Sequence, residues 1–259
     1  MEHLISARTR AQTVDKTAAT LGVALPAKYV EQVAQTHAFA DAAAQIAATA
    51  DDLLTAVFAA IEDGRDYHSD PSVQRLALDH QLTSLNLGRT TERRVNEMLA
   101  AALTDWADDI LDGWADALEP HSAALLAAAE AGLSPNSADA AAAKGVDAMR
   151  LLHDAQIAVK AWTDAVNGFY ALAAVSGISY RGQGPLVLTS ARRAVLEPAY
   201  EMARDARIDV DAWVLARCSI PLRLATIGEF MSRVAHYQAD KAAEDRAREQ
   251  RRVEAGFNR

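Results

Sequence analysis

Apolar side chains recur at alternating steps of three and four over one long stretch in the second half of the chain. This period places them on one stripe of an α-helix. Smaller residues continue the same phase upstream, so we predict a single helix that begins after Ser137, ends near Val175 and buries its stripe against another helix. The seam consists of Leu152, Ala155, Val159, Trp162, Val166, Phe169 and Ala173, preceded by Ala138, Ala141, Gly145 and Ala148.

A second helical pattern lies between Pro26 and Asp63, where neither Pro nor Gly interrupts the chain. We predict one long helix there, with a heptad seam that contains two polar members, His37 and Asp51. Polar residues at such positions fix register or partner choice at a cost in stability; alternatively, the helix rotates along its length and exposes them. The seam reads Val30, Val33, His37, Ala40, Ala44, Ala47, Asp51, Leu54, Phe58 and Ile61.

The remaining helices are predicted from their boundary residues. Asp70 followed by Pro71 has the pattern of an N-cap and a first helical position, and that helix should end near Gly88. Further helices are expected over 3–21, over 92–118 with a restart at Pro120, from Thr189 or Ser190, from Asp209 or Asp211, and from Pro221.

The segment 176–190 interrupts this helical pattern. It contains three glycines and a proline, followed by the β-prone residues Leu186, Val187 and Leu188. We predict a loop with at most one short strand. The fold class is therefore all-α, an elongated multi-helix bundle with long Ala-rich helices. The predicted division is a long-helix bundle over 1–175, the Gly-rich linker over 176–190, and C-terminal helices with a charged tail over 191–259.

Composition limits the classes of partner. The 259 residues are 51% hydrophobic, enough for a sizeable core, and the formal net charge is −9. An acidic chain lacks the basic surface that general binding to nucleic acid or an anionic membrane needs, so neither partner is expected. Cys218 is the lone cysteine, which excludes an intramolecular disulfide. With no long apolar run and no secretory signal, we expect an intracellular location, or a virion if a phage encodes the protein.

The motif DDILD, from Asp108 to Asp112, is the most specific indication of chemistry in the sequence. It resembles the aspartate-rich DDxxD motif of the isoprenoid synthases, an all-helical enzyme family. That resemblance implies that Asp108, Asp109 and Asp112 bind Mg²⁺, which holds a substrate diphosphate. The second metal motif and the basic pyrophosphate segment of that family are not evident in this sequence. The alternatives are a solvated acidic flank or a site for a basic partner.

Two other groups of residues are candidates for protein contacts. Arg89, Arg93 and Arg94 open a predicted helix, where the macrodipole favours anions, so they indicate an acidic partner or a solvated surface. Trp162 and Phe169 lie on the long seam, where they are either core residues or contacts to a partner, since Trp is frequent at interface hot spots. The charged tail, which ends in RAREQRRVEAGFNR, mixes both signs, as exposed helices do.

The chain lacks the usual motifs of catalysis. It contains no GxSxG, Walker A or GxGxxG motif, and no Glu-x-x-His pair for a di-iron bundle. We therefore predict a non-catalytic structural, assembly or adaptor protein that requires no cofactor. It should act through contacts with a protein partner, which is either another copy of itself or a different chain, and a homo-oligomer is expected, in the manner of scaffold or phage virion components. The alternative is a Mg²⁺-dependent enzyme of the isoprenoid-synthase type.

Overall fold

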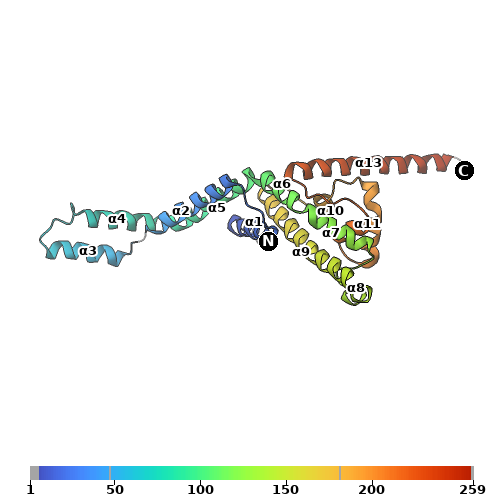
Figure 1. The fold of residues 1–259 in the computed structure, drawn as a ribbon. Coiled ribbons are helices and arrows are strands. Elements are labelled where there is room, and N and C mark those ends of the chain that lie inside the picture. Colours follow the sequence, from blue (N-terminus) through green and yellow to red (C-terminus); the bar gives the residue numbers. More distant parts are fainter. Residues whose placement is uncertain (1–5, 47, 181, 258–259) are drawn as a thin grey trace. The chain divides into compact units, whose positions relative to one another are not determined.

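The computed structural model describes residues 6–46, 48–180 and 182–257. Within these residues every regular element is an α-helix, which confirms the predicted all-α class (Figure 1). No helix in this part of the chain combines the length and apolar character needed to cross a membrane. The helices are α1 Ala7–Leu21, α2 Ala27–Ala44, α3 Ala50–Glu62, α4 Pro71–Ser84, α5 Leu87–Asp105, α6 Ala107–Ala117, α7 Glu119–Glu130, α8 Ala138–Lys144, α9 Val146–Val175, α10 Gly184–Leu188, α11 Arg193–Ala206, α12 Ala212–Arg217 and α13 Ile227–Phe257.

The chain divides into two compact units. The first contains Ala27–Ala102 together with the residues up to Arg8, and the second contains Thr9–Pro26 and Leu103–Arg259. The first unit therefore holds α2, α3, α4 and most of α5, and the second holds most of α1 and all of α6 to α13. These units differ from the predicted domains, because 176–190 lies inside the second unit instead of linking two domains.

Helix α9 is the centre of the second unit. It packs against α6, α7, α8, α10 and α12, most extensively against α7, which runs beside it in Figure 1. The predicted seam is largely buried, including Trp162 and Phe169. A second stripe of small residues is also buried, so α9 is covered on more than one side. These residues are Ala158, Ala161, Ala165 and Gly168.

Gly168 marks the closest approach in this core. A Cβ atom added there would lie 2.4 Å from Cζ3 of Trp114 on α6 and 3.1 Å from Oγ1 of Thr17 on α1. The Thr17 hydroxyl also donates a hydrogen bond of 3.1 Å to the backbone carbonyl of Asp164. Three helices of the second unit therefore meet at a position that accommodates only a glycine.

The structure breaks three of the predicted long helices. The helix predicted over 138–175 is split by Gly145, whose φ of 102° is a conformation that L side chains rarely adopt. The stretch from Pro26 to Asp63 forms α2 and α3, because Thr49 begins a new helix in a capping box with Asp52; Ala47 lies outside the described residues. The helix predicted over 92–118 is interrupted at Trp106, between α5 and α6.

Several other boundaries also shift. Asn86 adopts a φ of 60°, so α4 ends at Ser84 and α5 begins before Thr90 and Thr91. The apolar residues after Gly184 form the short helix α10, in place of the strand that we considered. The predicted N-caps Asp70 and Asp211 are confirmed by their hydrogen bonds to backbone N–H groups.

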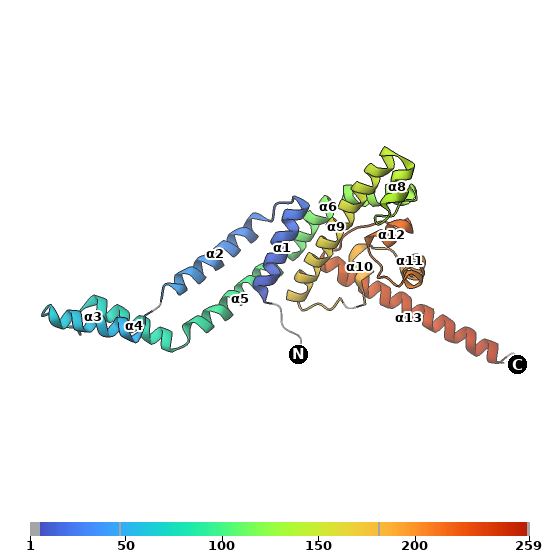
Figure 2. The ribbon, with the colours of Figure 1, turned by 90° about the horizontal axis from the view of Figure 1, so that it is seen from below.

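The start of α13 is the largest correction. The prediction placed it at Pro221, but the helix begins at Ile227. The segment before it runs along the end of α10, where the N–H of Arg223 donates to the carbonyl of Leu188 at 2.7 Å. Thr226 and Glu229 then form a reciprocal pair of cap hydrogen bonds. Beyond Asp240 the helix is exposed on all sides (241–250) and extends past the other helices of its unit, as Figure 2 shows.

Candidate functional site

One face of α3 exposes three large apolar side chains, which we call the α3 face. Leu54, Phe58 and Ile61 are 50%, 58% and 54% exposed. Their spacing of four and three residues places them on one stripe of the helix. The sequence placed these residues in a buried seam, and the structure corrects that prediction by leaving them open to solvent.

The partner helix of α3 covers only part of it. In Figures 1 and 2, α4 runs beside α3, and the two helices pack against each other. Within 50–85 the buried residues are Ala60, Asp70 and Val73. Leu78 and Leu85 add two more large apolar side chains that are 56% and 67% exposed. The hairpin thus buries little of its own apolar surface.

The α3 face has an acidic border. At 100° per residue, Asp51 and Glu62 lie within about 40° of Phe58 around the helix, and both are exposed. The carboxylate of Asp52 is engaged in the capping box, and its hydrogen bonds with the side chain and backbone of Thr49 hold its pKa below the ordinary value. A surface that docks here must tolerate or neutralise this negative charge.

The heptad seam predicted for α2 does not match the buried side of that helix. Tyr29 and Thr36 are buried, whereas their neighbours in the predicted seam, Val30 and His37, are exposed. The predicted register is therefore shifted by one residue at these two positions. The structure exposes His37, in agreement with the alternative that the polar positions of the seam face solvent.

The arginines proposed for an acidic partner lie on α5. Arg89 is exposed, and the side chains of Arg93 and Arg94 are 74% and 62% exposed. Arg93 and Arg94 approach the carboxylate of Glu97 at 4.0 Å and 3.4 Å, respectively. Such exposed pairs contribute little to stability, so all three arginines remain accessible to a partner.

The structure removes Trp162 and Phe169 from the candidate interface. They are 1% and 0% exposed, because neighbouring helices of the second unit cover α9. Phe169 also makes an edge-to-face contact with Phe230 of α13, with ring centroids 5.2 Å apart. Both residues belong to the core, which is the alternative that the sequence left open.

The DDILD motif lies on α6, and its first aspartate has a structural partner. Oδ1 of Asp108 accepts a hydrogen bond of 2.7 Å from the N–H of Ile227, the first residue of α13. A carboxylate at this point satisfies one of the free N–H groups of the helix and complements its dipole. Asp108 therefore joins α6 to α13.

The other two aspartates of the motif do not complete a metal site. Asp109 is exposed. The pKa of Asp112 is raised by partial burial and then by the negative charges of Glu229 and Asp108, with Arg223 acting in the opposite direction. Among the described residues, no group of three or more His, Cys, Asp or Glu side chains is arranged to hold a metal ion. The carboxylates of the motif thus do not converge as the resemblance to isoprenoid synthases implies.

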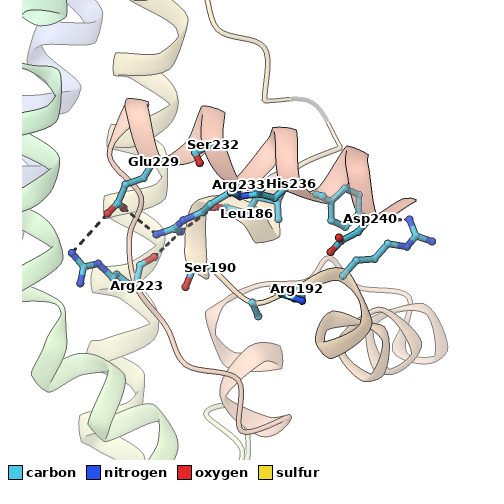
Figure 3. A pocket seen from close by; sticks show the side chains of 12 residues that line it. Leu186, Ser190, Arg192, Arg223, Glu229, Ser232, Arg233, His236 and Asp240 are labelled. Carbon is cyan, nitrogen blue, oxygen red and sulfur yellow. Dashed lines mark hydrogen bonds and ion pairs between the residues drawn. The ribbon is translucent and has the colours of Figure 1, made fainter. Parts of the chain in front are cut away.

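A second candidate site is a pocket of about 650 Å³ in the second unit, which we call the arginine pocket (Figure 3). It is formed by α10, the segment after it up to the first residue of α11, Arg223 in the segment before α13, and the first half of α13. Four arginines line it, whereas its carboxylates are those of Glu229 and Asp240. The arginines are Arg192, Arg193, Arg223 and Arg233.

Arg233 forms the rigid part of this pocket. Its side chain is 9% exposed, and burial lowers the pKa of its guanidinium while Glu229 acts in the opposite direction. Nη1 donates to the backbone carbonyls of Leu186 and Arg223, each at 3.1 Å, and Nη2 donates to Oε2 of Glu229 at 3.1 Å. These bonds join α10, the extended segment before α13, and α13 itself (Figure 3).

The other arginines of the pocket are less constrained. Arg223 lies 3.8 Å from the Glu229 carboxylate and is 66% exposed. Arg193 donates to Glu244 at 2.9 Å, and its guanidinium carbon lies 5.4 Å from the ring centroid of Tyr237. Arg192 is exposed and makes no ion pair within the described part of the chain.

No protein-family model, curated protein or solved structure matches this chain. The candidate sites therefore rest on geometry alone. The arginine pocket was not predicted, since its residues come from three segments that are separate in the sequence. One feature of the sequence indicates the base of this pocket. Thr226 and Glu229 have the spacing of a capping box, and Glu229 and Arg233 have the i,i+4 spacing of an ion pair.

Proposed function

We propose that this protein is a non-catalytic assembly protein that associates with further copies of itself through the α3 face. The observation that carries the proposal is the exposure of Leu54, Phe58 and Ile61 on a hairpin that has almost no core of its own. A hairpin of two short helices is marginal in isolation. Covering this face would supply the buried surface that the first unit lacks.

The size of the exposed surface fits association with a second copy. Full burial of such a side chain contributes about 1.5–3 kcal/mol, so burying the exposed half contributes roughly 1 kcal/mol. A two-fold contact that uses the three residues of the α3 face on both copies would therefore gain roughly 6 kcal/mol. That gain is comparable to the estimated cost of association, about 4–15 kcal/mol, which indicates a moderate, concentration-dependent complex.

The acidic border predicts how this association responds to salt. In a contact between two α3 faces, Asp51 and Glu62 of both copies come near one another. Salt screens such repulsion between exposed charges and strengthens apolar contacts when the anion is a kosmotrope such as sulfate. Self-association should therefore tighten as ionic strength rises, whereas docking of a basic partner would weaken.

The exposed arginines of α5 and the charged second half of α13 add surfaces through which such an assembly could extend. These features support the scaffold- or virion-type role expected from the sequence. The hydrogen bond that engages Asp108 with Ile227 of α13 argues against the Mg²⁺-dependent alternative.

Size-exclusion chromatography with light scattering, run as a dilution series, tests the proposal. We expect a mass above 27.8 kDa that falls toward the monomer on dilution. The double variant Leu54→Ser, Phe58→Ser should require at least tenfold higher concentration to associate. A matched control replaces two exposed apolar residues of the second unit, Ile157→Ser and Val195→Ser, and should associate as the wild type does.

Two results would overturn the proposal. One is a wild-type chain that stays monomeric up to about 100 μM, far above the concentrations at which complexes of μM affinity form. The other is an equal loss of association in the α3 variant and in the control variant, which would place the interface elsewhere.

A further inference from the structure

We propose that the arginine pocket binds a small phosphorylated molecule through Arg192 and Arg223. This proposal is independent of self-association, because the pocket lies in the second unit and shares no residue with the α3 face.

The charge of the pocket points to an anion. The chain carries a net charge of −9, yet four arginines meet at one cavity lined by two carboxylates. One of these, Glu229, is already engaged by Arg233 and is near Arg223. Outside the lining, Glu244 and Glu197 act on Arg193 and Asp112 acts on Arg223, whereas Arg192 makes no ion pair within the described residues.

The geometry separates fixed from free arginines. Arg233 is held by two carbonyls and a carboxylate, so it contributes a fixed positive charge at the base of the pocket. Arg192 and the exposed Arg223 keep donors available for a ligand. A planar guanidinium presents paired N–H groups that match the oxygens of a phosphate. Ser190 and His236, which also line the pocket, can provide further hydrogen bonds.

The size of the pocket favours a phosphate attached to an organic group. A volume of about 650 Å³ falls within the range of small-molecule sites, about 300–1,000 Å³, and exceeds what a bare phosphate fills. Ala191 and the ring of Tyr237 provide apolar surface beside the charged groups. Tyr237 is held at the wall by Arg193, whose guanidinium lies over its ring and whose Nη1 donates to its hydroxyl at 3.5 Å.

Calorimetric titration of the full chain at low ionic strength tests this assignment. The probes are adenosine 5′-diphosphate, inorganic pyrophosphate and, as a carboxylate of similar charge, citrate. The test variant is Arg192→Ala, Arg223→Ala, in which both altered side chains are exposed. The control is Arg248→Ala, which removes an exposed arginine of α13 outside the pocket. Circular dichroism confirms that each variant is folded.

We expect the nucleotide to bind the wild type and the control, and the double variant to bind it at least tenfold more weakly. Added salt should weaken the binding, because the contacts are between charges. Binding of pyrophosphate but not of nucleotide would contradict the proposal that the ligand carries an organic group. Citrate binding as tightly as the phosphates would contradict phosphate recognition and favour an acidic peptide. Absence of binding at millimolar concentrations, or equal affinity in the double variant, would overturn the proposal.

Discussion

Helices α9 and α3 carry the same kind of apolar stripe and have opposite surroundings. On α9 the stripe with Trp162 and Phe169 is buried by other helices of its unit, whereas on α3 the stripe with Leu54, Phe58 and Ile61 is half exposed. The sequence pattern is alike in both. The difference arises because the second unit supplies several helices around α9, while α3 has α4 as its main neighbour.

This contrast indicates that the two units use apolar surface for different purposes. The second unit completes its own core, so its apolar residues stabilise the fold. The first unit leaves apolar residues open, and soluble monomers rarely expose contiguous patches of this kind without a function. Matched substitutions in the two helices should therefore separate stability from association.

The largest effect is expected for Trp162→Ala. Removing a fully buried aromatic side chain should lower the free energy of unfolding by about 3–5 kcal/mol, measured by urea denaturation at a concentration where the chain is dissociated. Trp162→Phe should cost much less. It keeps a ring in the core and removes an indole N–H that has no hydrogen-bond partner in the described structure. A loss below about 1 kcal/mol in the alanine variant would contradict a buried seam.

The next effect is expected for Gly168→Ala. The new methyl group would overlap the Trp114 ring, whose Cζ3 lies 2.4 Å from the Cβ position. Overpacking of this kind costs about 1–3 kcal/mol or more, although alanine is the better helix former. The control Gly113→Ala on α6 meets its nearest atom, Cγ1 of Val23, at an ordinary 3.6 Å. Equal stability of the two variants would contradict the close approach of α6 and α9 at Gly168.

Substitutions at two aspartates of the DDILD motif should change the stability of the folded chain in opposite directions. Asp108→Ala removes the hydrogen bond to the N–H of Ile227, so it should lower the free energy of unfolding by about 1 kcal/mol. Asp112→Asn should raise the melting temperature at pH 7. The folded state raises the pKa of Asp112 above 3.8 and therefore disfavours its charged form.

The pH dependence checks that sign. The destabilisation from charged Asp112 is present above its folded pKa and disappears as the pH falls below its unfolded value. The advantage of Asp112→Asn should therefore vanish near pH 3. Stabilisation of the wild type by Mg²⁺, lost equally in both variants, would instead support the metal site implied by the resemblance to isoprenoid synthases.

The smallest effect on stability is expected for Phe58→Ala. A half-exposed side chain away from a core should change the free energy of unfolding of the dissociated chain by no more than about 0.5 kcal/mol. The same substitution should weaken self-association, measured by sedimentation velocity. A loss similar to that of Trp162→Ala would show that the α3 face is part of a core within the single chain.

The all-α class and most helices could be predicted from the sequence, because apolar periodicity and caps such as Asp70 and Asp211 are local signals. The breaks at Gly145 and Thr49 were missed. Continuity of an apolar pattern does not reveal a turn, although a glycine and a Thr-x-x-Asp sequence stand at these points. The late start of α13 is hard to predict because Pro221 is itself a typical start signal, whereas the helix begins after the capping box at Thr226.

The candidate sites were less predictable than the fold. Periodicity shows which residues share a face, but the neighbours that cover the face come from elsewhere in the chain. For this reason Trp162 and Phe58 could not be told apart. The arginine pocket combines segments whose proximity depends on tertiary structure, as in the bond from Arg233 to the carbonyl of Leu186.

Hydrogen–deuterium exchange at two protein concentrations tests the contrast between α3 and α9 most directly. If the α3 face joins copies, the amides of 50–84 should become more protected as the concentration rises from about 1 to about 100 μM, the range in which complexes of μM affinity form. The amides of α9 should exchange at the same rate at both concentrations. Unchanged protection of 50–84, with a monomeric mass at both concentrations, would contradict the account.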